Sequence, residues 1–144
     1  MPSIYIDTTA LAKWYLNEAR SDDVEEYLRR ACPVYISLLT KIEMRSLMAR
    51  RAREHHVDAE TQSKVLATFE GDVALGHLVL LPHTVESFLA AESLLGTHPN
   101  IPLRSLDALH LGVMRAAGIE ILATADRVMA LVGAELGMEC KVFI

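Results

Sequence analysis

Four acidic residues stand where short apolar segments of the sequence give way to helical patterns: Asp7, Glu43, Asp107 and Asp126. They are spread over almost the whole chain, so only folding could bring them together. Carboxylates gathered in one place repel one another and raise one another's pKa unless a cation neutralises them. Mg²⁺ is bound by carboxylate oxygen, often together with phosphate. If the four side chains meet, the sequence predicts a metal-dependent enzyme that acts on phosphodiesters.

The elements that must position these acids follow from the hydrophobic pattern. Short apolar runs predict strands over residues 3–6, 34–36, 78–81, 119–123 and 141–144. Apolar residues at helical spacing predict helices over residues 10–16, 21–31, 39–55, 58–76, 84–95 and 105–117, and a short helix capped by Thr124. Strands that alternate with helices and are continuously apolar predict an α/β fold, with a central parallel sheet of four to five short strands covered by helices on both faces. We expect residues 1–144 to form a single domain, because the chain has no repeat and no linker.

In such a sheet the ligand site lies at the carboxyl ends of the strands, where the chain passes into helices. Asp7 and Asp126 follow predicted strands directly, Glu43 follows the second strand by about two helical turns, and Asp107 opens the helix after a Pro-rich loop. Glu86 passes the same test, because it follows the strand over 78–81. Position along the chain therefore does not select the four acids by itself.

Each acid also has an ordinary structural explanation. Thr40 and Glu43 have the spacing of a capping box, in which the glutamate returns a hydrogen bond to the cap residue. Asp107 and Asp126 stand in first turns, where the helix dipole favours an acid. Asp7 could cap the first helix. The residues alone leave a structural and a catalytic role open for each acid.

Composition narrows the classes of function. The 144 residues carry a formal net charge of −5. Proteins that hold nucleic acid by bulk electrostatics are usually basic, so this charge disfavours that mode. A nuclease stays open, because a bound metal ion supplies positive charge locally. A chain that is 51% hydrophobic and 23% charged fits a compact globular protein.

Cellular location is predicted from what the sequence lacks. Cys32 and Cys140 have neither a C-x-x-C partner nor zinc-like spacing. A disulfide is the alternative, and we expect two partly buried thiols in a reducing compartment. The first residues do not resemble a signal peptide. No apolar run approaches the roughly 20 residues that cross a bilayer. We expect a cytoplasmic protein without membrane contact.

Local sequence around the acids resembles the PIN-domain family, in particular its VapC-type toxin ribonucleases. The resemblance rests on four segments in family order: YIDTTALAKWYLNE (5–18), SLLTKIE (37–43), LDALHL (106–111) and ATADR (123–127). It spans nearly the full length of a single-domain member and separates the four acids from Glu86. It implies a PIN-like fold.

The resemblance also implies a mechanism. Family members hold Mg²⁺ or Mn²⁺ in an acidic pocket and hydrolyse RNA phosphodiester bonds as endoribonucleases. Matching the segments makes Asp7 and Asp107 the main metal ligands, with Glu43 and Asp126 completing the site or orienting the attacking water. The hydroxyls of Thr9, where the family often has serine, and of Thr124 would fix the carboxylates.

Basic residues near these segments are candidates for contacting substrate phosphate. We predict this role for Lys13, Lys41 and Arg104. The basic stretch over residues 45–53 is expected to be a solvated helix face. His110, one turn after Asp107, is expected to be a packed helix residue rather than a metal ligand.

Partners and alternatives complete the predictions. The resemblance implies a homodimer that is held inactive by a small antitoxin protein. The alternative is a catalytically silent PIN-fold module that binds RNA or protein; four intact carboxylates argue against it, since unused clustered charge costs stability. A phosphatase with an aspartyl nucleophile would require Asp at position 9, where Thr9 stands.

Overall fold

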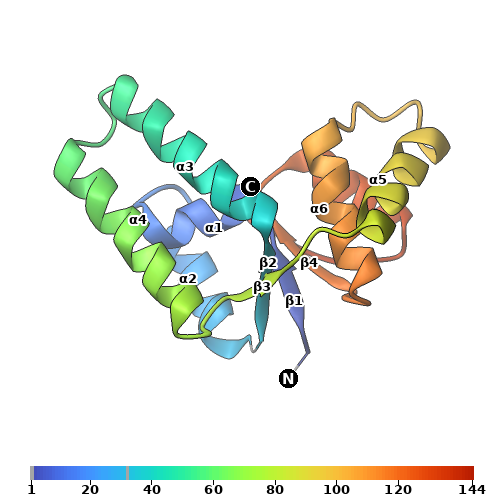
Figure 1. Ribbon diagram of the computed structural model, residues 1–144, viewed down its shortest axis with the longest axis horizontal. Coiled ribbons are helices and arrows are strands. Elements are labelled where there is room, and N and C mark those ends of the chain that lie inside the picture. Colours follow the sequence, from blue (N-terminus) through green and yellow to red (C-terminus); the bar gives the residue numbers. More distant parts are fainter. Residues whose placement is uncertain (1, 32) are drawn as a thin grey trace.

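A computed structural model describes residues 2–31 and 33–144, and over these ranges strands alternate with helices (Figure 1). In chain order the elements are β1 (Ile4–Ile6), α1 (Thr8–Tyr15), α2 (Ser21–Arg30), β2 (Val34–Ser37), α3 (Leu38–Arg53), α4 (Ala59–Ala74), β3 (Val79–Leu81), α5 (Val85–Thr97), α6 (Ser105–Ala116), β4 (Ile121–Thr124), α7 (Arg127–Glu135) and β5 (Glu139–Val142). The predicted α/β fold is confirmed, and each predicted strand and helix has a counterpart.

The five strands form one parallel sheet in the order β3-β2-β1-β4-β5. The central strand β1 places Tyr5 between Tyr35 of β2 and Leu122 of β4. From β1 the chain builds outward through β2 and β3 on one side, and then through β4 and β5 on the other. Strand order therefore reverses between β1 and β4, and in open α/β sheets ligands bind at the carboxyl ends of the strands at such a reversal.

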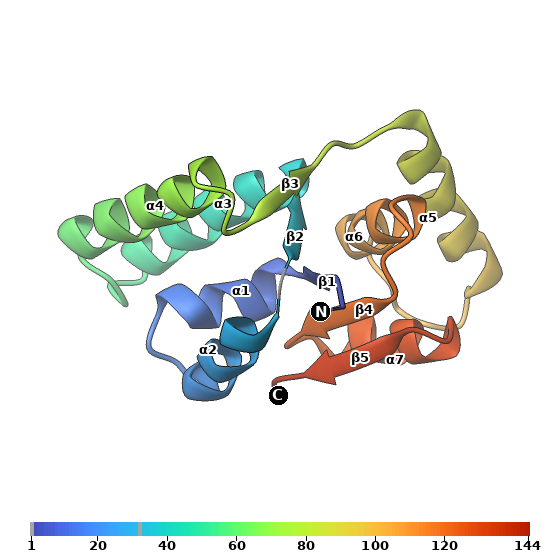
Figure 2. The same ribbon diagram turned by 90° about the horizontal axis from the view of Figure 1, so that it is seen from below.

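Helices cover both faces of the sheet, as the sequence predicts (Figures 1 and 2). Successive residues of a strand point to opposite faces, so Ile4 and Ile6 enter one core while Tyr5 enters the other. The first core joins the sheet to α1, α2, α3 and α4, and the second joins it to α5, α6 and α7. The carboxyl ends of the strands lie where elements from both layers meet.

The helix ends explain which acids cap helices. Asp7 caps α1 by accepting a hydrogen bond from the Ala10 N–H at 3.0 Å. Asp126 caps α7, whereas the predicted cap, Thr124, ends β4. The predicted capping role of Glu43 is wrong: α3 begins one turn earlier, and the Thr40 hydroxyl accepts from the backbone N–H of Ser37 at 3.1 Å. The side chain of Glu43 therefore takes no part in capping α3.

The last strand lies at Glu139–Val142 rather than over 141–144. It is an edge strand whose residues alternate between exposed and half-buried. A continuous apolar run therefore does not indicate its position in the sequence. Cys140 in this strand is a partly buried free thiol, and Cys32 lies outside the described residues. Over residues 2–31 and 33–144, no helix combines the length and apolar character that a membrane crossing requires.

Candidate active site

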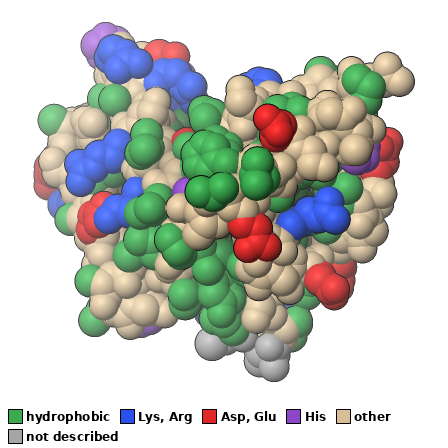
Figure 3. Space-filling model, turned by 45° about the vertical axis from the view of Figure 1, so that its right-hand side comes forward, with side chains coloured by type: hydrophobic (Ala, Val, Ile, Leu, Met, Phe, Trp, Pro, Cys, Tyr) green, Lys and Arg blue, Asp and Glu red, His purple; other side chains and the backbone are tan. Residues whose placement is uncertain are grey.

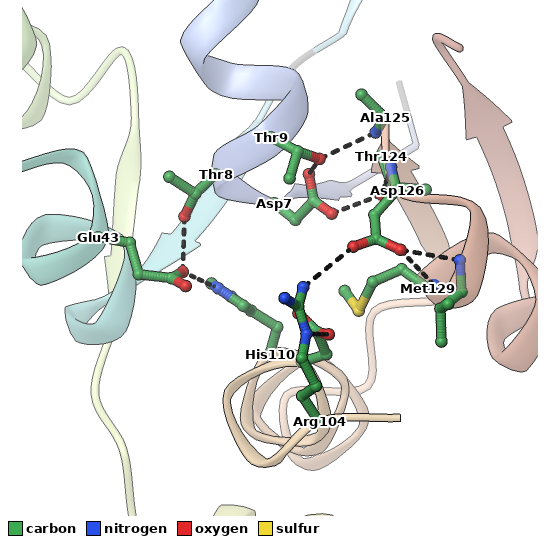
Figure 4. A network of polar contacts seen from close by, with 12 residues as sticks. Asp7, Thr8, Thr9, Glu43, Arg104, His110, Thr124, Ala125, Asp126 and Met129 are labelled. Atoms are coloured by element: carbon green, nitrogen blue, oxygen red, sulfur yellow. Dashed lines mark hydrogen bonds and ion pairs between the residues drawn. The ribbon is translucent and has the colours of Figure 1, made fainter. Parts of the chain in front are cut away.

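The structure brings Asp7, Glu43 and Asp126 to one edge of the sheet, at the reversal between β1 and β4 (Figure 4), and Asp107 is linked to Asp126 there through Arg104. Asp7 follows β1, Asp126 follows β4, Asp107 lies in the first turn of α6, and Glu43 lies on α3. Segments more than 100 residues apart thus contribute to one polar network, which runs through the hydroxyls of threonines, an arginine and a histidine.

Asp7 is the most enclosed of the four, with 2% of its surface exposed. Oδ1 accepts from the Thr9 hydroxyl at 2.6 Å and from Ala10 N–H at 3.0 Å, and Oδ2 accepts from the Thr124 hydroxyl at 2.5 Å. Burial raises the pKa of Asp7 above its ordinary value, even though the three hydrogen bonds oppose the shift. A nearby cation would relieve this cost of burying a charge.

The two predicted hydroxyls tie Asp7 to the end of β4. While Thr9 donates to Asp7, it accepts from the Ala125 N–H at 3.0 Å. Thr124 likewise accepts from the Asp126 N–H at 2.9 Å. Both hydroxyls therefore connect the Asp7 carboxylate, which follows β1, to the backbone that follows β4, and this fixes its orientation.

Asp107 and Asp126 share one arginine. Arg104 Nε donates to Asp107 Oδ2 at 3.0 Å, and its NH2 group reaches Asp126 Oδ2 at 3.4 Å. The other oxygen of Asp126 accepts from the N–H groups of Val128 and Met129. Burial raises the pKa of Asp107, Arg104 opposes the rise and the charge of Asp126 adds to it. The guanidinium thus acts as the counter-charge of two carboxylates that repel each other.

Glu43 is held by a different set of partners. Its Oε1 accepts from the Thr8 hydroxyl at 2.7 Å and from Nε2 of His110. Burial alone would raise the pKa of Glu43, but the hydrogen bond and charge of His110, aided by Thr8, hold it below its ordinary value. His110 is packed in α6 as predicted, with 2% exposed, yet it also binds one of the four acids.

Of the three predicted phosphate contacts, the structure places Arg104 in the network. Lys13 donates to the carbonyl oxygen of Ala19 at 2.8 Å. This contact lies beyond the C-terminal end of α1, whereas Asp7 caps the N-terminal end. Lys41 lies 3.1 Å from Glu70 of α4. In this structure both lysines are engaged with other partners.

Glu86, which passes the positional test, lies elsewhere. It is exposed in the first turn of α5 and borders a shallow hollow with Ser93 and Arg115. Its strand, β3, is at the edge of the sheet and far in strand order from the β1–β4 reversal. Topology thus separates Glu86 from the other acids for a reason that the linear sequence does not contain.

The donor chemistry of the site fits a hard divalent cation, but the present arrangement is not a finished metal centre. Among residues 2–31 and 33–144, no three His, Cys, Asp or Glu side chains are grouped closely enough to hold an ion as they stand. The guanidinium of Arg104 occupies the space between two carboxylates, and Glu43 faces His110. Because 74% of the Arg104 side chain is exposed, it can leave without disturbing the core.

Sequence reasoning missed three functional candidates: Tyr5, Thr8 and the acid-binding role of His110. The spacing of Asp107 and His110 contained a usable indication, because residues three apart lie on the same helix face. Thr8 and Tyr5 flank Asp7, but their partners come from α3 and α6, so only the folded chain identifies them.

Comparison with known proteins adds independent support for the fold and for kinship. The PIN domain family model matches residues 4–135. Ribonuclease VapC46 of Mycobacterium tuberculosis is 33% identical over 141 residues, which cover 96% of this chain and 95% of that protein. Among solved structures, VapC20 of M. tuberculosis, a sarcin–ricin loop cleaving toxin, superposes with a TM-score of 0.72 at 20% identity and covers 90% of this chain and 95% of its own. DNA-bound VapBC of Salmonella typhimurium gives 0.70 at 15% identity and full coverage of both chains.

Proposed function

The chain belongs to the PIN domain family, and from this premise we propose that it is a divalent-metal-dependent endoribonuclease that hydrolyses RNA phosphodiester bonds as the toxin of a toxin–antitoxin pair. One observation carries the proposal: all four acids stand at the same strand reversal, where α/β sheets bind ligands. The relationship to a ribonuclease over nearly the whole chain supports the choice of substrate.

In this proposal Asp7 and Asp107 hold Mg²⁺ or Mn²⁺, and Asp126 and Glu43 complete the site. A bound ion would polarise a phosphoryl oxygen, lower the pKa of attacking water and stabilise the leaving 3′ oxygen. Carboxylate oxygen is the ligand that both ions accept. The raised pKa values of Asp7 and Asp107 support this role, because a cation stabilises the charged form that burial disfavours.

The neighbouring side chains have separate tasks. Thr9 and Thr124 keep Asp7 in one orientation through the hydrogen bonds described above. Arg104 exchanges its two carboxylates for a substrate phosphate, which its planar guanidinium can bind through two parallel hydrogen bonds. Exposure of the Arg104 side chain supports this exchange.

Partners follow from the proposed activity and the surface. RNA is the substrate, and we propose a small antitoxin as the inhibitor and a homodimer as the assembly. Large exposed apolar side chains occur on α3, α5 and α6: Leu38, Ile42, Val85, Phe88, Leu89 and Leu106. Hydrophobic side chains gather near the middle of one face (Figure 3), and such patches commonly mark protein interfaces. Several structural neighbours are VapBC complexes.

Two further predictions rest on the same proposal. Both cores pack on one sheet, which supports a single domain over residues 1–144. An RNA substrate and the free thiol of Cys140 support a cytoplasmic location.

The test is cleavage of labelled RNA by the purified protein with Mg²⁺ or Mn²⁺, with EDTA as a control. We expect cleavage that EDTA stops and that the variant Asp107→Asn lacks. Glu86→Gln is the matched control, because this acid also opens a helix after a strand but lies outside the site. Cleavage that survives Asp107→Asn, or no cleavage of any RNA pool, would contradict the proposal and favour the silent binding module.

A further inference from the structure

His110 lies in the middle of α6 and uses both nitrogens of its buried ring. Nδ1 is 2.6 Å from the Tyr5 hydroxyl, and Nε2 bonds Oε1 of Glu43. The Tyr5 ring meets the imidazole edge-on, with the ring centroids 5.7 Å apart. Figure 4 shows the imidazole directed from α6 toward Glu43 on α3. A single side chain thus connects helices from the two layers.

The hydrogen-bonding roles at Glu43 follow from its chemistry. An ionised carboxylate only accepts, so Nε2 of His110 must carry a proton and donate it. On the other side of the ring, the Tyr5 hydroxyl lies within hydrogen-bonding distance of both Nδ1 and the hydroxyl of Ser37, the latter at 3.0 Å. Whichever of Tyr5 and Nδ1 is the donor between them, the Nε2 proton points at Glu43. The series of hydrogen bonds from Ser37 through Tyr5 and His110 to Glu43 therefore orients Oε1 of the acid.

Packing alone does not account for this arrangement. A buried polar ring needs hydrogen-bond partners for its nitrogens, whereas an apolar residue like its neighbour Leu111 could fill the space without any. Asp7 and Asp126 accept from backbone N–H groups, whereas the contacts of Glu43 are with side chains. Both donors reach Oε1, and Oε2 takes no hydrogen bond from a described residue.

We propose that His110, itself held by Tyr5, is a positioning residue that fixes Oε1 of Glu43 so that Oε2 is available to a divalent cation. This inference rests on the proposed metal-dependent function. It predicts that the ring affects cation affinity mainly through Glu43, the acid to which it is hydrogen-bonded.

The test is Mn²⁺ binding by the complete protein without RNA, measured from the electron paramagnetic resonance signal of free Mn²⁺. His110→Asn keeps an amide near Nδ1 but ends short of Glu43, and we expect Mn²⁺ affinity to fall about 10-fold, the usual effect of losing a residue that orients a metal ligand. His110→Gln places an amide N–H near the position of Nε2 and should restore affinity to within about threefold of wild type. Glu43→Gln should lower the affinity at least as much as His110→Asn, and the double variant should be no weaker than Glu43→Gln alone.

Leu111→Val is the packing control, because it reduces the neighbouring buried side chain of α6 and leaves the network intact. It should lower the melting temperature without changing Mn²⁺ affinity. Unchanged affinity in His110→Asn, or additive losses in the double variant, would overturn the positioning role and leave the proposed function standing. A wild-type protein that binds no Mn²⁺ would overturn both. If His110→Asn does not fold, Tyr5→Phe decides instead: it removes one buried oxygen, and unchanged affinity there overturns the inference.

Discussion

The site has two halves that hold their carboxylates through partners of different kinds. The aspartate half consists of Asp7, Asp107 and Asp126, and its counter-charge is the exposed guanidinium of Arg104. The glutamate half consists of Glu43, whose partner His110 is almost completely buried. The partner of the aspartate half can therefore be exchanged for a metal ion or a phosphate, whereas the partner of the glutamate half belongs to the core.

The pKa shifts express the same difference. In the aspartate half burial prevails, and the pKa values of Asp7 and Asp107 are raised. In the glutamate half the partners prevail over burial, and the pKa of Glu43 is lowered. At neutral pH ionised Asp7 and Asp107 therefore cost stability, whereas ionised Glu43 contributes it. Charge that is held at such a cost is typical of sites that require an external cation.

The largest expected effect separates activity from stability in the aspartate half. Asp7→Asn removes the most buried charge, and RNA cleavage should fall by more than about 100-fold, because a metal ligand matters more than the groups that orient it. The melting temperature should change little, because removal of the buried charge offsets the hydrogen bond that the amide nitrogen of Asn cannot accept. Cleavage assays and thermal unfolding of the same preparation check both expectations. A large drop in melting temperature would show that the Asp7 charge is structural.

The second prediction affects both halves together, because α6 carries Asp107 and His110. A Cβ at Gly112 of α6 would lie 2.4 Å from the Ser87 carbonyl oxygen of α5. The two helices must separate to admit it, so Gly112→Ala should lower the free energy of unfolding by about 1–3 kcal/mol. Urea unfolding measures the change. Gly71→Ala is the control: no atom lies within 4 Å of the added Cβ, and a helical alanine should be neutral or stabilising.

Much of the fold could be predicted because the pattern that encodes it is local. The alternation of Ile4, Tyr5 and Ile6 marks a strand buried on both faces, and the strand ends then place Asp7 and Asp126. The predicted position of edge strand β5 differs from the observed one because its residues are at most half-buried and form no continuous apolar run. Cap positions were misassigned where several adjacent residues can cap, as with Thr124 and Asp126.

The site was predictable as a set of acids and not as a set of contacts. Which acid faces which partner depends on how α6 lies against α3 and against the segment that follows β4, and no local pattern in the sequence contains that arrangement. Arg104 was predicted to contact substrate phosphate, whereas here its partners are Asp107 and Asp126. The sequence predicts only a packing role for His110, because its hydrogen-bond partners Tyr5 and Glu43 are 105 and 67 residues away along the chain.

A third prediction distinguishes the halves by pH. The lowered pKa of Glu43 means that its contribution to stability is present above its unfolded value of 4.5 and disappears as pH falls through its folded pKa. Glu43→Gln should therefore melt about 2–5 °C below wild type at pH 7, with the difference vanishing in acid. Thermal unfolding between pH 7 and pH 3 measures this. Glu86→Gln, exposed and outside the site, should show no such convergence, and a constant difference for Glu43→Gln would mean that packing dominates its role.

The smallest expected effect tests whether the counter-charge of the aspartate half is exchangeable. Arg104 is an exposed partner of two carboxylates, and ion pairs of this kind contribute little because solvent screens them. Removing the guanidinium with Arg104→Gln takes away a competitor for the same oxygens, so Mg²⁺ should bind about two- to fivefold more tightly in the absence of RNA. Titration calorimetry measures the affinity, and Arg115→Gln, at the opposite end of α6, is the control for a change in net charge. Weaker Mg²⁺ binding in Arg104→Gln would mean that the arginine holds Asp107 and Asp126 in the geometry the ion requires. The counter-charge would then be as much a part of the framework as His110, and the contrast between the two halves would disappear.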